Sequence, residues 1–367
     1  MFQPYVERLC VDLGQARRIA QEMGGQFEPI FDTTYLGGGT PTILDISQLK
    51  QLFVTISQNF EVLPASEITI ECAPGTLTPA LIDALAEVGV NRVSLGVQSF
   101  VDQEAAWVGR LHKRENVIDE LSRLRAAGIS KINIDLIAGL PGQTASSWDF
   151  SLEQTIATEV PHVSVYMLEV DNDSRLGREL IAGGTRYHAH FVPNDDLTAD
   201  LYSMACEQLE RTGVQQYEIS NFARPGREST HNLKYWTREP YLGFGVDAHS
   251  MLRVITDADR NGSAVRFSTA DSLQAYLQGD RLTRTFVDPE AAMEETFFLG
   301  LRLTRGVDLD AISSTFGSEA IARFQPAIGE MTESGLLQHE GKMLRLTSRG
   351  RLLSNEVFER FISNPVP

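Results

Sequence analysis

Short apolar segments of strand length alternate with amphipathic helical segments through the first 220 residues, and this alternation constrains the fold more than any other feature. Neighbouring parallel strands need long crossovers, which are usually helices. Strands are predicted at residues 33–36, 67–72, 92–96, 131–137, 162–168 and 215–219. Helices are predicted at residues 4–23, 47–59, 78–89, 114–127 and 195–211, with one more capped by Ser146. The pattern predicts an α/β protein with a parallel sheet, covered on both faces or wrapped as a barrel.

The regular alternation of strand and helix segments ends after residue 220. Residues 221–283 form a less regular connecting region, and residues 284–367 favour helices at 289–303, 309–316 and 318–334, a hairpin at 336–346 and a helix at 348–362. This order is typical of a winged-helix module. Its recognition segment carries one basic residue, Arg323, against Glu319, Glu330 and Glu333, so a packing domain is favoured over a DNA reader. Three domains are therefore predicted: 1–220, 221–283 and 284–367.

The net charge and the distribution of apolar and cysteine residues indicate which partners and which cellular location this protein has. Acidic residues number 49 against 32 basic ones, and the net charge of −17 repels phosphate backbones, which argues against nucleic-acid binding. No apolar run reaches the length of a membrane span, and the first residues carry early charges without a signal-peptide core. Cys10, Cys72 and Cys206 are too scattered for a disulfide framework. A cytoplasmic protein, at most peripherally associated with membranes through its partners, is predicted.

Polar and glycine residues stand where the predicted strands end. In parallel α/β folds ligands bind at the carboxyl ends of strands. A glycine run precedes Thr40, and either serves a ligand or is an ordinary turn, while Glu71 is either a hydroxyl-binding acid or a solvated one. Asp135 interrupts an apolar strand and is expected to face a ligand or a basic partner. Taken together, the candidate binding residues are Gly38, Gly39, Thr40, Glu71, Gln98, Arg110 and Asp135.

The ordered motifs GGGTP, ECAPGT, GVQSF, GRLH and NIDLIAGLPGQ closely resemble the group of radical S-adenosylmethionine (SAM) proteins that includes oxygen-independent coproporphyrinogen oxidase (HemN) and the HemW haem chaperones. HNLKYW at residues 231–236 is similar to a motif associated with HemW. The resemblance implies a partial (β/α)6 barrel holding SAM, with a winged-helix-like C-terminal domain. It also implies that the glycine run meets the methionine amino group, that Glu71 binds the ribose, and that Gln98, Arg110 and Asp135 complete the pocket.

The same resemblance implies a [4Fe–4S] cluster held by a C-x3-C-x2-C loop after a first strand. That strand and loop are missing from the pattern here, since the series opens with a helix. We therefore expect an N-terminally truncated copy, arising biologically or from a misassigned start. Because Cys10, Cys72 and Cys206 lack ligand spacing, we expect this chain not to assemble the cluster. No catalytic residue and no other metal-ligand set is predicted.

The resemblance favours a haem chaperone that passes haem to respiratory-chain apoproteins. The alternatives are the coproporphyrinogen III oxidase, which converts two propionates to vinyls, and an inactive truncated relative. His231 is a candidate axial ligand of haem, and Lys234 and Arg238 are candidates for pairing with its propionates. The competing interpretation is that HNLKYW simply docks the C-terminal domain.

Overall fold

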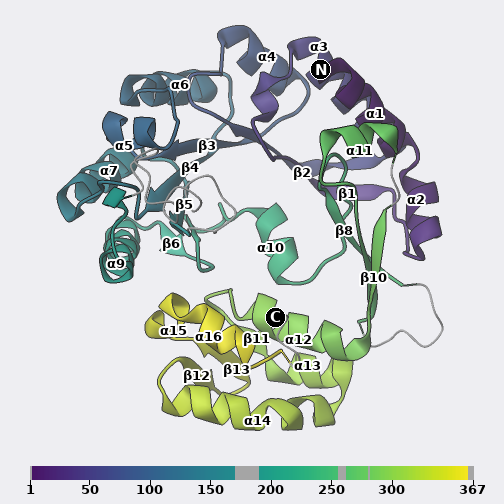
Figure 1. Cartoon of the computed structure of the whole chain (residues 1–367), viewed down its shortest axis with the longest axis vertical. Helices are drawn as coiled ribbons and strands as arrows, with labels where there is room; N and C mark the ends of the chain where they lie inside the picture. The colour runs from purple at the N-terminus through teal and green to yellow at the C-terminus, as the bar shows by residue number, and fades with distance from the viewer. Residues whose placement is uncertain (1, 170–189, 255–261, 280–281, 363–367) are drawn as a thin grey trace. The chain divides into compact units, whose positions relative to one another are not determined.

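The computed structural model describes residues 2–169, 190–254, 262–279 and 282–362, which fold into two compact units. One unit consists of Met1–Asp32, Ser47–Ser66 and Thr230–Pro367, and the other of Thr33–Ile46 and Glu67–Ser229. Each unit is therefore assembled from segments that are far apart in the sequence. Figure 1 labels the elements described below.

The main sheet has seven strands in the order β1-β2-β3-β4-β5-β7-β6. Their bounds are β1 Ile30–Leu36, β2 Glu61–Cys72, β3 Arg92–Gln98, β4 Lys131–Ala138, β5 His162–Met167, β6 Gln215–Gln216 and β7 Asn221–Ala223. Strands β2 to β5 are parallel neighbours. The predicted α/β class with a parallel sheet is confirmed.

The parallel run ends after β5. A strand at 215–219 was expected to continue the series, but β6 covers only two residues and pairs antiparallel with β7, which in turn pairs antiparallel with β5. The side chain of Glu218 accepts hydrogen bonds from the backbone N–H of Ser220 and from the amide of Asn221. These bonds hold a tight turn, and the chain reverses there instead of extending.

The helices that follow the strands mostly match their predicted positions. They are α3 Ile46–Asn59, α4 Pro79–Glu87, α5 Asp102–Trp107, α6 Arg114–Ala126, α7 Ala145–Ala157 and α9 Asp195–Arg211. Thr78 caps α4 as predicted, by accepting from the N–H of Leu81. The cap of α7 is Thr144 and not Ser146, because Thr144 and Ser147 exchange hydrogen bonds between backbone N–H and hydroxyl oxygen.

The leading helix predicted at 4–23 is two helices, α1 Phe2–Gly14 and α2 Ala16–Met23. Gln15, between them, has φ −102° and ψ 5°, outside the helical region. Glycine is the weakest helix former apart from proline, so the break after Gly14 has a local cause.

Strict alternation in β4 decides which residues reach the candidate site. Ile132, Ile134, Leu136 and Ala138 are fully buried on one face of the sheet. Successive side chains of a strand point to opposite faces, so Asn133 and Asp135 lie on the other face. The register carries this polar face across the sheet, because Ser94 lies opposite Asn133 and Ser164 opposite Asp135.

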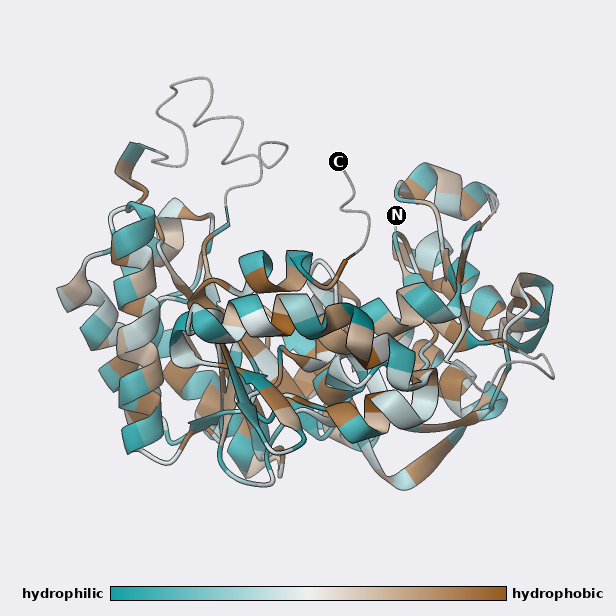
Figure 2. Cartoon of the chain, turned by 90° about the horizontal axis from the view of Figure 1, so that it is seen from below, coloured by the Kyte–Doolittle hydropathy of each residue, from teal (hydrophilic) through white to brown (hydrophobic). Residues whose placement is uncertain are grey.

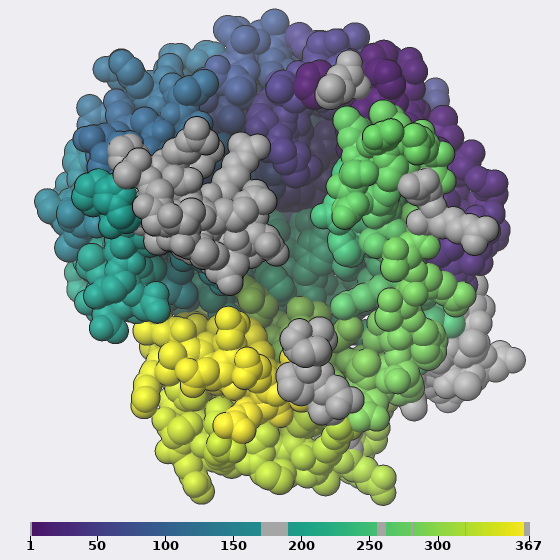
Figure 3. Space-filling model, in the orientation of Figure 1, coloured from purple at the N-terminus to yellow at the C-terminus, as the bar shows by residue number. Residues whose placement is uncertain are grey.

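The unit that contains the N-terminus has a second, antiparallel sheet in the order β10-β9-β8, with bounds β8 His249–Arg253, β9 Ala264–Ser268 and β10 Thr283–Val287. The short helix α10 Thr230–Trp236 precedes this sheet in the sequence, and the short helix α11 Leu273–Gln278 connects β9 to β10. The hydroxyl of Tyr276 in α11 donates to Asp12 in α1 at 2.6 Å, and Figure 3 shows this green segment lying against the purple N-terminal helices.

The C-terminal part of the same unit has the predicted winged-helix order. Its elements are α12 Pro289–Gly300, β11 Val307–Asp308, α13 Leu309–Phe316, α14 Ser318–Glu333, β12 Leu337–Glu340, β13 Met343–Leu346, α15 Ser348–Leu352 and α16 Ser354–Glu359. The predicted final helix is divided at Leu353, whose ψ of 32° leaves the helical region. Phe297 packs at 4.9 Å, between ring centroids, against both Phe324 and Phe361.

Helices across the chain carry hydrophilic and hydrophobic bands, as expected of helices that bury one face (Figure 2). Within the described ranges, every helix is too short or too polar to traverse a bilayer.

Candidate functional site

Glu71 is fixed at the carboxyl end of β2 by two donors. The hydroxyl of Tyr35 donates to its Oε1 at 2.7 Å, and the backbone N–H of Gly38 donates to its Oε2 at 3.1 Å. A Cβ on Gly37 would lie 2.6 Å from the Tyr35 ring and 2.9 Å from Oε1 of Glu71. The first glycine of the run therefore makes room for the carboxylate.

The next two glycines leave open space beside that carboxylate. Gly38 and Gly39 have φ of 80° and 69°, the left-handed region that favours glycine, and no neighbouring atom of the described residues lies within 4 Å of the position of a Cβ at either one. Thr40 follows in extended conformation and leads into the short 3-10 helix Pro41–Ile43. A ligand can thus approach the backbone at Gly38 and Gly39 without meeting the protein's own side chains.

Gln98 and Arg110 converge over Gly96, near the end of β3. A Cβ at Gly96 would lie 3.1 Å from Nε2 of Gln98 and 3.5 Å from Nη2 of Arg110. Gln98 is buried and has φ 68°, an uncommon conformation for a residue other than glycine. It follows an irregularity in the pairing of β3 with β4 that re-aims the strand end.

Asp135 lies in a cage of neutral donors. Ser94 Oγ donates to its Oδ2 at 2.9 Å, and Asn133 Nδ2 donates to its Oδ1 at 2.7 Å. Burial raises the pKa of Asp135 to about 6; hydrogen bonds from Ser94, Ser164 and Asn133 hold that pKa down, and the charge of Glu71 raises it. The expected basic partner is absent among the hydrogen bonds described for this side chain. The donors described for the carboxylate are neutral, so these bonds stabilise it without adding a positive charge.

A buried hydrogen-bond network beneath Asp135 orients its carboxylate, and it is not among the residues predicted from the sequence. Asn133 shares its two amide hydrogens among Ser94 (2.7 Å), Asp135 and Ser164 (2.9 Å). Its Oδ1 lies 2.6 Å from Nδ1 of His162, whose Nε2 lies 2.9 Å from the hydroxyl of Tyr217. Burial, helped by the charge of Arg92, lowers the pKa of His162, so its imidazole is neutral. Because the amide oxygen only accepts, the imidazole proton is on Nδ1.

Two tyrosines border the pair of carboxylates. Burial and the nearby charge of Glu71 raise the pKa of Tyr35, and burial followed by the charge of Asp135 raises that of Tyr166. Both phenols therefore stay neutral and can donate hydrogen bonds. The strand ends combine two carboxylates, two phenols, an amide, one guanidinium and an open glycine backbone. Such a set suits a ligand that carries positive charge and hydroxyl groups.

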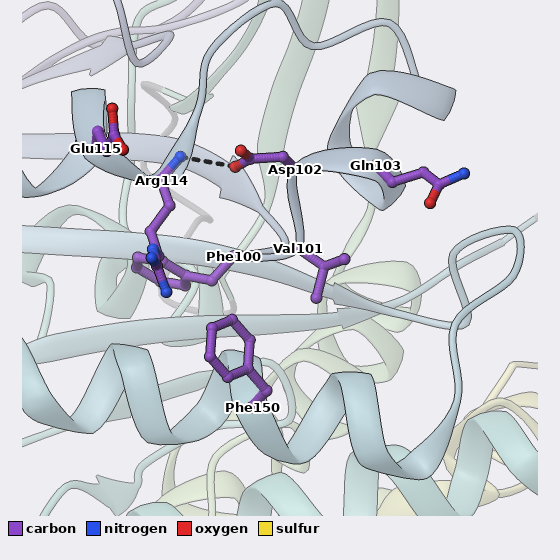
Figure 4. A pocket seen from close by; sticks show the side chains of 7 residues that line it. All are labelled: Phe100, Val101, Asp102, Gln103, Arg114, Glu115 and Phe150. Atoms are coloured by element: carbon purple, nitrogen blue, oxygen red, sulfur yellow. Dashed lines mark hydrogen bonds between the residues drawn. The ribbon is translucent and has the colours of Figure 1, made fainter.

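A separate surface pocket of about 350 Å³ lies at the start of α5 and α6 (Figure 4). Asp102 accepts from the backbone N–H of Arg114, and the guanidinium of Arg114 lies 5.5 Å from the ring centre of Phe150. None of the predicted binding residues lines this pocket. We therefore place the candidate site at the strand ends.

The three cysteines do not form a cluster site. Cys10 is in α1 and accepts from the hydroxyl of Thr55, Cys72 is buried in β2 with its pKa raised by burial, and Cys206 is in α9. Across the described ranges, no group of three His, Cys, Asp or Glu side chains is placed to hold a metal ion. These cysteines do not fit the ligand set of a [4Fe–4S] cluster.

The HNLKYW segment forms α10. The rings of His231 and Tyr235 meet edge to face at 5.2 Å, and the guanidinium of Arg302 lies 4.3 Å from the ring centre of Trp236. The two cations proposed for propionates are already paired: Lys234 Nζ lies 2.8 Å from Asp32, and Arg238 Nε lies 2.6 Å from Glu295. Glu295 belongs to α12, against which α10 packs, so part of the motif does dock the C-terminal region.

Comparisons with known proteins agree with this architecture. Residues 11–154 match the radical SAM superfamily, and residues 287–353 match the HemN C-terminal domain. The chain is 34% identical to the haem chaperone HemW of Bacillus subtilis and 32% identical to that of Lactococcus lactis; each alignment covers 91% of this chain, with 86% and 85% of the relatives.

Among solved structures, coproporphyrinogen III oxidase (HemN) from Escherichia coli has the same fold. The TM-score is 0.80 at 23% identity, covering 98% of this chain and 82% of the other. The match to two family models in order, together with whole-length relatives above 30% identity, is decisive. The chain belongs to the HemW family of radical SAM proteins.

Proposed function

We propose that this protein is a haem chaperone that binds SAM at the carboxyl ends of β1 to β4 and haem beside α10. The observation that carries the proposal is whole-length similarity to relatives named haem chaperone HemW. Delivery of haem to respiratory-chain apoproteins is the finer form of the proposal. The cysteines are free thiols, which suits the reducing cytoplasm.

The arrangement of the strand-end residues also supports SAM binding, independently of the similarity to relatives. Glu71 can accept both hydroxyls of a ribose, because its carboxylate is held in place by Tyr35 and Gly38. Gly38, Gly39 and Thr40 would meet the methionine end, with Gln98 and Arg110 beside it. Asp135 supplies negative charge for the ammonium or sulfonium group. In this superfamily a cluster-bound SAM supplies a radical, but since the cysteines here do not fit the cluster, we derive no radical step.

The haem part of the proposal predicts a specific role for His231. We expect His231→Ala to weaken haem binding by about tenfold or more, equivalent to about 1.4 kcal/mol, because a neutral imidazole is a good axial ligand. Titration of the protein with haem, followed by Soret absorbance, measures the change. His249→Ala is the matched control, since His249 is an exposed histidine of the same unit paired with Asp247. Equal titrations of His231→Ala and the parent would refute the assignment.

The SAM part predicts a pH dependence governed by Asp135. With a pKa of about 6, Asp135 gains a proton at lower pH and loses its attraction for a cationic ligand. Affinity should be level above pH 7 and fall by about tenfold per pH unit below 6. Calorimetry of SAM binding from pH 5 to pH 8 measures this.

The control is Asp135→Asn, which should bind weakly with a flat profile over the same range. Fold stability should change in the opposite direction: because the folded pKa is raised above the ordinary 3.8, stability is present at low pH and is lost as the pH rises through 6. An unchanged slope in Asp135→Asn would assign the titration to another group.

A further inference from the structure

Two arginines share a single carboxylate beside α10. Glu295 Oε2 lies 2.6 Å from Nε of Arg238, and Glu295 Oε1 lies 3.1 Å from Nη2 of Arg266. Arg238 also donates from Nη1 to the carbonyl of Gly262 at 2.6 Å. Counted over the described side chains, this group holds two positive charges against one negative charge.

Two of the three side chains in this group lie largely out of solvent. The side chains of Arg238 and Glu295 are 10% and 9% exposed. Nη2 of Arg238 and Nε of Arg266 are buried and have no hydrogen-bond partner among the residues that the structure describes. A buried donor on an uncompensated charge is costly unless an acceptor is supplied. The missing acceptor is anionic in character, because it must balance the second guanidinium.

Arg266 is the arginine that can reach such an acceptor. It lies on β9, the central strand of its sheet, opposite Met251 and Thr285, and its side chain is 42% exposed. Arg238 contributes indirectly, because it pairs with the same carboxylate of Glu295.

An aromatic ladder runs from this arginine pair to His231. Tyr241 lies close enough to Arg266 and Glu295 for both charges to act on the pKa of its hydroxyl. Its ring meets that of Tyr235 at 4.8 Å, and Tyr235 meets His231 at 5.2 Å. The ladder offers apolar ring surface with a nitrogen ligand at one end and a cation at the other.

We propose that Arg266 binds a carboxylate of a flat aromatic ligand that lies along the rings of Tyr241, Tyr235 and His231. This inference rests on the proposed function in one respect: it takes the ligand to be haem and the carboxylate to be a propionate. It replaces Lys234 and Arg238 as the propionate partners, since Lys234 is paired with Asp32 and Arg238 is 10% exposed, whereas Arg266 is 42% exposed. With a net charge of −17 the protein repels a dicarboxylate at long range, so binding needs a local cation of this kind.

The test uses iron-free protoporphyrin IX and its dimethyl ester, in the same mild detergent, with the full chain. Neither probe can be ligated by His231, so the anion site is measured separately from haem ligation. We expect Arg266→Gln to weaken protoporphyrin IX binding by about tenfold, because the variant loses a charged hydrogen-bond donor to the carboxylate. The dimethyl ester should bind the parent and Arg266→Gln equally. Fluorescence titration reports both.

Two further variants test the direction of the change in protoporphyrin IX affinity and the effect of removing an unrelated arginine. Glu295→Gln removes the competing carboxylate and should tighten protoporphyrin IX binding, a change opposite to that of Arg266→Gln. Arg253→Gln is the matched control, because Arg253 is an exposed arginine of the same sheet with its own partner, Glu239. If Glu295→Gln fails to fold by circular dichroism, the comparison of Arg266→Gln with the ester decides.

The outcomes separate this inference from the proposed function. Arginine-dependent binding of protoporphyrin IX supports the anion site, even where His231→Ala leaves haem titrations unchanged. Equal binding of the acid and the ester by the parent, or equal loss in Arg266→Gln and Arg253→Gln, overturns it. Absence of protoporphyrin IX binding by the parent also overturns it.

Discussion

Arg92→Met should lower the free energy of unfolding by about 3–5 kcal/mol, because it leaves Glu67 as a buried charge without its partner. The two side chains are 3% and 2% exposed, and Nε of Arg92 donates to Glu67 Oε2 at 3.0 Å. The same guanidinium donates from Nη2 to the carbonyls of Arg227 and Glu228, each at 2.8 Å. Urea denaturation followed by circular dichroism measures the loss.

The matched control is Arg211→Met, which removes an exposed ion pair to Glu207 in the same unit and should change stability by no more than about 0.5 kcal/mol. The double variant Arg92→Met/Glu67→Leu should recover much of the loss, since removing both charges leaves neither unpaired. A double variant no more stable than Arg92→Met alone would show that the carbonyl contacts, which both variants lack, and not the charge pair, account for the loss.

Asn133→Ala should have a comparable effect on stability and a second effect on ligand binding. It leaves buried groups of Ser94, Ser164 and His162 short of a partner, at about 1–3 kcal/mol for each unsatisfied group. It also removes a donor that stabilises ionised Asp135, so the pKa of Asp135 should rise further. The pH at which SAM affinity begins to fall should move upward.

Calorimetry across the pH range and urea denaturation measure the two effects in parallel. Asn116→Ala is the control, because Asn116 is an exposed capping residue of α6 with only local hydrogen bonds. A pH profile unmoved in Asn133→Ala would mean that the amide contributes to packing alone.

Sequence periodicity predicted the alternation of strands and helices, and the bounds of α9 and α13 agree with the prediction to the residue. It also predicted that Glu71 and Asp135 lie on the same edge of the sheet, on β2 and β4 to either side of β3, because parallel strands align their carboxyl ends. Periodicity did not predict the hydrogen-bond network of Ser94, Asn133 and Ser164. The spacing of two residues between the polar side chains Asn133 and Asp135 in β4 was the available signal. Asn133 points to the same face of the sheet as Asp135, and Ser94 and Ser164 are their counterparts on the neighbouring strands. Comparing these positions across the strands would have identified one polar face.

Two other features of the structure could not be predicted from the sequence, because they depend on contacts between particular side chains. The reversal between β6 and β7 depends on the side chain of Glu218, and no local turn signature marks it. The partners of Lys234 and Arg238 are Asp32 and Glu295, far away in the sequence. A single sequence shows which cations are present, but the fold decides which of them remain available to a ligand.

The discontinuous make-up of the two units has a consequence for synthesis on the ribosome. The hydrogen bond between Asp12 and Tyr276 joins residues separated by 264 positions. At about 5–20 residues per second, roughly 13–50 seconds pass between their emergence. The segments Thr33–Ile46 and Glu67–Ser229 can complete their unit during that interval, while α1 and α2 wait with an apolar face uncovered. Nascent chains stalled after Ser229 has emerged, but before α11 has, should therefore protect the parallel sheet from protease and leave α1 and α2 open to cleavage.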